Sequence, residues 1–84
     1  MSAEEHYQKG IKALQDGNFV EAEQEFRTST VLNPDKYESW NLLGLSYQFQ
    51  KKWPQCVDVW RQALRCQPDS TDTMLNLGIA CIAA

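Results

Sequence analysis

The side chains best suited to chemistry in this chain are a single histidine, His6, and three cysteines, Cys56, Cys66 and Cys81. A histidine can act as a general base or as a metal ligand. The cysteines are odd in number and have no close spacing, which argues against both a zinc site and a disulfide framework. We therefore expect free thiols, which suit a reducing cytosol.

An acidic run, Glu21, Glu23 and Glu25, is the other candidate for a cation site. Alternate residues of a helix do not share one face, so these carboxylates do not converge on one ion. We expect a solvated helix start, favoured by the helix macrodipole. No Ser-His-Asp set, phosphate-binding loop or carboxylate pair can be assembled either. The sequence thus predicts no catalytic residues, no metal and no cofactor, and the protein is expected not to be an enzyme.

Composition excludes further classes of function. Hydrophobic residues make up 43% of the 84-residue chain and charged residues 23%, as in one small globular domain. The net charge is −3 and the densest basic run is Lys51-Lys52, which argues against a nucleic-acid partner. No apolar run has the length of a membrane span and no signal-peptide pattern opens the chain, so we expect a cytoplasmic protein without membrane insertion.

The chain repeats itself with a fixed period. Gly10, Gly44 and Gly78 are evenly spaced, with a period of 34 residues (44 − 10 = 34 and 78 − 44 = 34). The same spacing separates proline, arginine and aromatic positions, and it aligns His6 with Trp40, which indicates a packing role for the histidine. Further equivalent pairs are Pro34 and Pro68, Arg27 and Arg61, Phe19 and Trp53, and Phe26 and Trp60.

Turn and cap signals divide the chain into five predicted helices. Asp16-Gly17-Asn18 is a turn, and Pro54 is placed to begin a helix. Ser2 and Glu5 form a capping-box pattern, and Asp35 is a candidate N-cap. The predicted helices are Ala3–Gln15, Asn18–Leu32, Lys36–Gln50, Pro54–Cys66 and Ser70–Ala83.

Packing can also be predicted from these helices. Glycine is unfavourable inside a helix by about 1 kcal/mol relative to alanine, so the recurring glycines indicate close contact with a neighbouring helix. By their place in the period, Trp40 and Trp60 are predicted to be buried, and Trp53 to be partly exposed beside a turn.

The residues resemble the tetratricopeptide-repeat (TPR) family, whose pattern is W-x₂-L-G-x₂-Y, then A-x₃-F, then P. Residues 40–47 give Trp40, Leu43, Gly44 and Tyr47, followed by Cys56-x₃-Trp60 and Pro68. The resemblance implies an all-α fold, a right-handed α-solenoid of antiparallel helix pairs. A single domain, 1–84, would hold repeats at about 3–36 and 37–70 and the first helix of a third at about 71–84.

In that family the first helix of each repeat lines a concave groove. Carried over by register, the resemblance implies a mostly apolar lining, which suits a helical or apolar peptide segment of a partner protein. We therefore expect a non-catalytic protein–protein interaction scaffold. The lining residues are Tyr7, Ile11, Leu14, Asn41, Leu42, Leu45, Phe49, Leu75, Asn76, Ile79 and Ile82.

Two other functions fit the same residues. The last predicted helix has no second helix to cover it, so residues 70–84 are candidates for a homodimer contact in a self-assembly module. A chaperone-like holder of an aggregation-prone segment would use the same groove. Light scattering separates the first of these from groove binding.

Overall fold

A computed structural model describes residues 2–68 of the chain, where the only regular elements are α-helices. They are α1 (Ala3–Gln15), α2 (Phe19–Leu32), α3 (Tyr37–Phe49) and α4 (Trp53–Cys66). Each begins and ends within one residue of its predicted bounds. The predicted fifth helix, Ser70–Ala83, lies outside the described residues.

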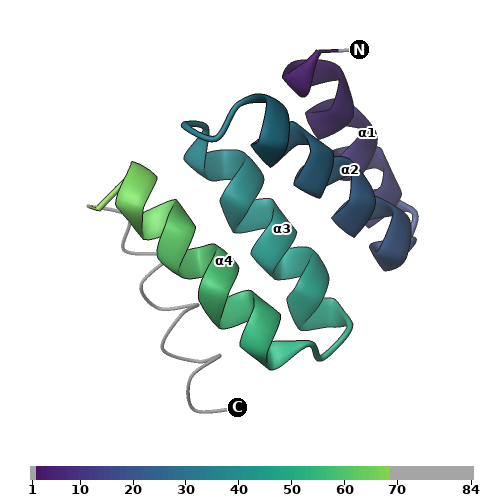
Figure 1. Ribbon diagram of the computed structural model, residues 1–84. Coiled ribbons are helices and arrows are strands. Elements are labelled where there is room, and N and C mark those ends of the chain that lie inside the picture. The colour runs from purple at the N-terminus through teal and green to yellow at the C-terminus, as the bar shows by residue number, and fades with distance from the viewer. Residues whose placement is uncertain (1, 69–84) are drawn as a thin grey trace.

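Each helix packs on the next one along the chain (Figure 1). Successive helices run antiparallel, so α1 with α2 and α3 with α4 form two helix pairs joined by short turns. The two pairs meet through α2 and α3, which lie side by side in the middle of the molecule.

The start of α1 confirms the predicted capping box. The Ser2 hydroxyl accepts the backbone N–H of Glu5 at 3.2 Å, while the Ser2 backbone N–H donates to the Glu5 carboxylate at 3.3 Å. The predicted cap of α3 is wrong. The residue at the N-cap is Lys36, not Asp35, and its side chain makes no capping hydrogen bond. The chain forms one further turn at Pro34 and Asp35 before the helix begins.

The turns inside the two helix pairs have the same backbone conformation. Gly17 has a φ of 79°, and Lys51, its equivalent one period later, has a φ of 60°. Both lie in the left-handed region, which closes the end of a helix by satisfying its last carbonyl groups. Equivalent hydrogen bonds do so in each turn: Gly17 N to Leu14 O, Asn18 N to Ala13 O, Lys51 N to Gln48 O and Lys52 N to Tyr47 O.

An aromatic ring lies directly on a glycine inside each pair. A Cβ atom on Gly10 would come within 2.6 Å of the Phe26 ring, and one on Gly44 would overlap the Trp60 ring. Phe26 and Trp60 are almost fully buried. The predicted close approach at these two glycines is confirmed, because only a residue without a side chain leaves room for the ring.

The tryptophans divide differently from the prediction. Trp60 is 1% exposed, as predicted, and Trp53 is half-buried beside its turn, also as predicted. The burial predicted for Trp40 is wrong, because this side chain is only half-buried. Its indole N–H donates to the Pro34 carbonyl oxygen at 2.8 Å, which holds the ring near the surface.

Candidate functional site

Seven of the predicted groove residues lie in the described part of the chain. Tyr7, Ile11 and Leu14 come from α1, and the rest from α3. Six of the seven are half-buried and Phe49 is 53% exposed. Four of them also pack against the buried core: Tyr7, Ile11, Leu14 and Leu42. Leu75, Asn76, Ile79 and Ile82 lie outside the described residues.

Tyr7 contacts both an aromatic ring and a lysine. Its ring meets Phe26 edge-on with centroids 5.9 Å apart, and the Lys36 ammonium lies 3.9 Å from its centroid. Lys36 also pairs with the Glu4 carboxylate. Burial raises the pKa of the Tyr7 phenol, and the hydrogen bond from Lys36 lowers the pKa of Glu4. One end of the predicted lining is therefore occupied by a lysine that sequence reasoning assigned no role. The period identifies Lys36 as the N-cap position of α3, because it is the equivalent of the N-cap Ser2, but it does not predict the contact with Tyr7.

Ile11 and Leu45 are two aliphatic residues of the predicted groove lining. They occupy equivalent positions of the period, on α1 and α3, and both are half-buried. Phe49 behaves differently, because its ring stacks on Phe19 of α2 with centroids 4.6 Å apart. Phe49 therefore belongs to the contact between the helix pairs as well as to the predicted lining.

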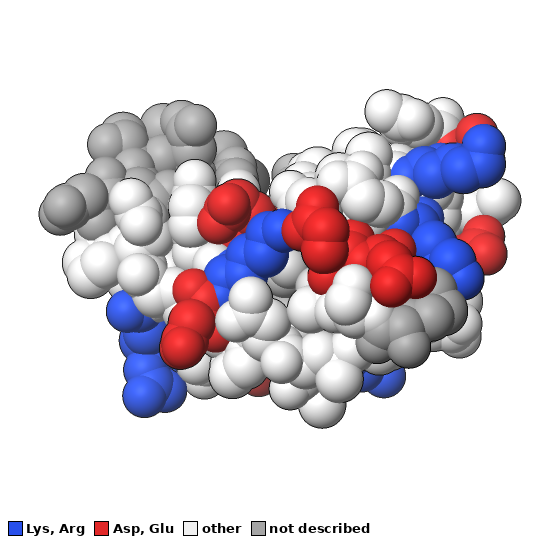
Figure 2. All heavy atoms as spheres, turned by 90° about the horizontal axis from the view of Figure 1, so that it is seen from above, with Lys and Arg blue, Asp and Glu red and all other residues white. Residues whose placement is uncertain are grey.

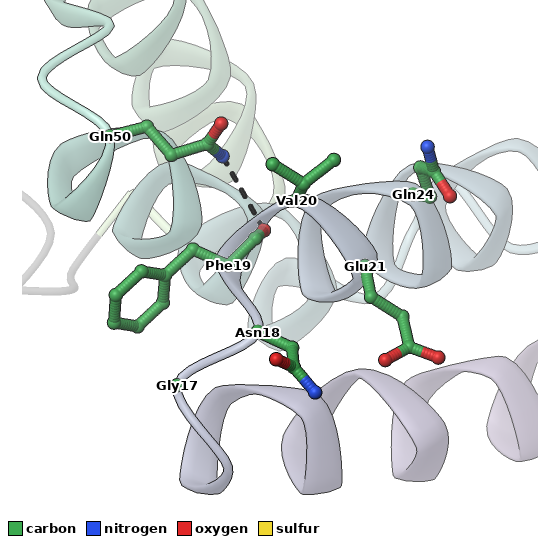
Figure 3. Close-up of a pocket in the computed structure, with 7 residues that line it drawn as sticks. All are labelled: Gly17, Asn18, Phe19, Val20, Glu21, Gln24 and Gln50. Carbon is green, nitrogen blue, oxygen red and sulfur yellow. Dashed lines mark hydrogen bonds between the residues drawn. The ribbon is translucent and has the colours of Figure 1, made fainter.

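A shallow hollow of about 550 Å³ lies elsewhere, at the start of α2 (Figure 3). None of the seven described groove residues lines it. Figure 3 shows Val20 and Gln24 on one side of α2 and Glu21 extending over α1, with Gln50 reaching from α3. The Gln50 amide donates to the Phe19 carbonyl oxygen at 3.4 Å. The lining thus mixes amides, one carboxylate and exposed apolar groups.

His6 contacts one residue of the acidic run, Glu25, but the three carboxylates of the run do not form one site in the described part of the chain. His6 Nδ1 lies 3.0 Å from a Glu25 carboxylate oxygen, and this contact joins α1 to α2. Glu21 is exposed, whereas Glu23 is only 7% exposed. The predicted solvated helix start is therefore wrong for Glu23. Within residues 2–68, no group of three His, Cys, Asp or Glu side chains is arranged to hold a metal ion.

The two described cysteines are free thiols. Cys56 is fully buried and its thiol donates to the Gly44 carbonyl oxygen at 3.3 Å. Burial raises the pKa of the Cys56 thiol to about 11, and burial also raises the pKa of Cys66. Because the thiolate is the nucleophilic form, neither is activated for chemistry near neutral pH.

The surface charge is mixed where it can be seen. Figure 2 shows acidic and basic side chains lying next to one another on the face viewed from above, with no large patch of one sign. In the described part of the chain, no helix combines the length and the apolar character that crossing a membrane requires.

Comparison with known proteins adds no relative. No family model matches the chain, and no curated protein matches it significantly. The interpretation of its function therefore depends on the geometry described above.

Proposed function

We propose that the chain is a protein–protein interaction scaffold of the TPR type, which binds a helical or apolar segment of a partner on the faces of α1 and α3. The support for a repeated unit is geometric. The two turns share their conformation and hydrogen bonds at equivalent positions of the period. The two glycine–ring contacts, Gly10 with Phe26 and Gly44 with Trp60, recur at the same spacing.

The observation that carries the binding proposal is the incomplete burial of Ile11 and Leu45 at equivalent positions. A helix that served only to fill a core would bury such side chains fully, since burying a large aliphatic side chain is worth about 1.5–3 kcal/mol. A partner segment with its own apolar stripe would complete that burial. Asn41, on the same helix as Leu45, adds a polar group at the face.

The test uses a displayed library of helical peptides, some with an apolar face and some wholly polar, selected against the wild-type chain. Peptides with an apolar face should be enriched, and a selected peptide should bind Leu45→Glu at least about tenfold more weakly, a change of roughly 1.4 kcal/mol. Leu45 is a suitable site because it is not among the partly buried residues packed on the core.

Val31→Glu is the matched control, because Val31 is 75% exposed on α2, away from the proposed face. Equal loss of affinity in both variants would contradict the proposal. Selection of polar, charged peptides would contradict it as well. Light scattering of the free chain tests the rival self-assembly function in the same samples.

A further inference from the structure

Glu23 is a buried carboxylate in the contact between the two helix pairs. Its side chain is 9% exposed and its oxygens accept three hydrogen bonds. Arg27, one turn along α2, donates at 2.7 Å. The other two donors come from the second pair: the Gln50 amide at 2.9 Å and the Lys52 ammonium at 3.3 Å.

The two donors of the second pair stand at the turn between α3 and α4. Gln50 is the C-cap of α3, and Lys52 is the N-cap of α4. Gln50 is itself held, because its amide nitrogen, whose two hydrogens are shared among three acceptors, also lies 3.4 Å from the Phe19 carbonyl oxygen and 3.2 Å from the Ser46 carbonyl oxygen. Glu23 therefore binds the turn that joins the two helices of the second pair.

Two further contacts between the pairs come from the same row of α2. Phe19, Glu23 and Arg27 are four residues apart, so they lie in one row along the helix. Phe19 stacks on Phe49, and the Arg27 guanidinium donates to the Tyr47 hydroxyl at 2.7 Å. At the far end the Ser29 and Ser39 hydroxyls lie 3.0 Å apart. These are short-range, directional contacts, in contrast to the ring-on-glycine packing inside each pair.

A buried carboxylate makes this contact sensitive to geometry. Hydrogen bonds weaken steeply when the donor moves out of line, and an ionised carboxylate left buried without donors is strongly unfavourable. Movement of the α3–α4 turn away from Glu23 would break two of its three bonds. The arrangement thus favours one angle between the pairs over others close to it.

We propose that Glu23 is the positioning residue that fixes the angle between the two helix pairs, and with it the separation of the α1 and α3 faces. The consequence for ligand binding rests on the proposed function, but the angle itself does not. Loss of Glu23 leaves helices intact within each pair and lets the second pair swing relative to the first.

The test is a distance distribution between the pairs, measured by pulsed electron spin resonance. Nitroxides are attached through non-canonical ketone residues at Lys12 of α1 and Asp58 of α4, both exposed, so that the native thiols remain unmodified. The full-length chain is compared with Glu23→Met, Glu23→Gln and Lys52→Met. Glu21→Gln is the matched control, because Glu21 is exposed on the same helix.

We expect Glu23→Met to broaden and shift the distribution most. Glu23→Gln should give a smaller change, since it keeps an acceptor for Gln50, and Glu21→Gln should give none. Far-UV circular dichroism should be unchanged. If Glu23→Met fails to fold, Lys52→Met decides, because it removes one of the inter-pair donors from an exposed position.

A second measurement separates positioning from mere stability. A peptide selected on the wild type should bind Glu23→Met at least about fivefold more weakly, at the low end of ordinary coupling between sites, although Glu23 is outside the groove. Wild-type distributions in both Glu23→Met and Lys52→Met would overturn the proposal. A changed distribution in a chain that selects no peptide would support the role of Glu23 and refute the proposed function alone.

Discussion

The contacts within each helix pair differ in kind from the contact between the pairs. Inside the pairs, rings lie on glycines among buried apolar neighbours such as Ala22 and Cys56, with some polar contacts such as that of His6 with Glu25. Between the pairs, the contact includes a carboxylate, an arginine, hydroxyl groups and one aromatic stack.

The two kinds of contact have different consequences. Apolar packing is worth roughly 25 cal/mol per Å² of buried apolar area and depends little on direction. A hydrogen bond adds only about 0.5–1.5 kcal/mol net but depends strongly on orientation. The apolar packing inside each pair therefore contributes stability with little directional preference, whereas the polar contacts between the pairs, which we call the seam, depend on the relative orientation of the pairs.

The largest expected effect comes from filling a glycine position inside a pair. In Gly44→Leu the new side chain would overlap the Trp60 ring, which is 1% exposed. We expect the free energy of unfolding to fall by about 3 kcal/mol or more, at or above the usual range for overpacking. Urea denaturation measures it, with Gln55→Leu at an exposed position of α4 as the control. An unchanged midpoint for Gly44→Leu would refute the close-packing assignment.

A smaller effect is expected from the seam. Ser29 donates its one hydroxyl hydrogen to the Ala3 carbonyl oxygen, so Ser39 must be the donor in the Ser29–Ser39 bond. Ser39→Ala removes that bond and leaves the Ser29 hydrogen satisfied. We expect a loss of about 1 kcal/mol in the free energy of unfolding.

Ser46→Ala provides the comparison for Ser39→Ala. Both serines are fully buried, but the Ser46 hydroxyl bonds to the Leu42 carbonyl oxygen of its own helix. That carbonyl keeps its place in the helix when the hydroxyl is removed, so the change should be close to neutral. Equal losses in the two variants would show that the seam adds nothing beyond local bonding.

The smallest expected effect tests whether the two pairs are equivalent at their turns. Lys51 has a left-handed φ of 60°, a conformation that costs a residue with a side chain about 1–2 kcal/mol. Lys51→Gly should raise the melting temperature slightly, by the equivalent of about 0.5–1 kcal/mol, since greater freedom in the unfolded chain offsets part of the relief. Gly17→Ala should lower it. If both substitutions move the melting temperature in the same direction, the two turns are not equivalent.

The helices could be predicted from the sequence, because several of their boundaries are marked locally. Asp16-Gly17-Asn18 and Pro54 stand at element ends, and Ser2 with Glu5 forms the predicted cap. Asp35 was misassigned because it lies in the turn before α3, so that one polar residue close to a helix start was mistaken for its cap.

The site was less predictable, because it depends on partners distant in the sequence. Glu23 accepts hydrogen bonds from Gln50 and Lys52, which belong to the other helix pair. No residue close to position 23 in the sequence predicts these contacts. Tyr7 lies on α1 as predicted, and its place in a groove stays a prediction, but the cover provided by Lys36 arises from a contact across nearly one full period of the chain. Periodicity predicts the helix face on which a residue lies; it does not predict the side chain that reaches across to it.

The glycine–ring contacts also bear on how the chain folds. In both pairs the ring follows its glycine by 16 residues in the sequence (26 − 10 = 16 and 60 − 44 = 16). The glycine–ring contact of each pair therefore closes a short loop. Closing a short loop carries a small entropic cost, and a low contact order is associated with folding in microseconds to milliseconds. Each pair can therefore collapse on its own ring before the seam between the pairs is joined.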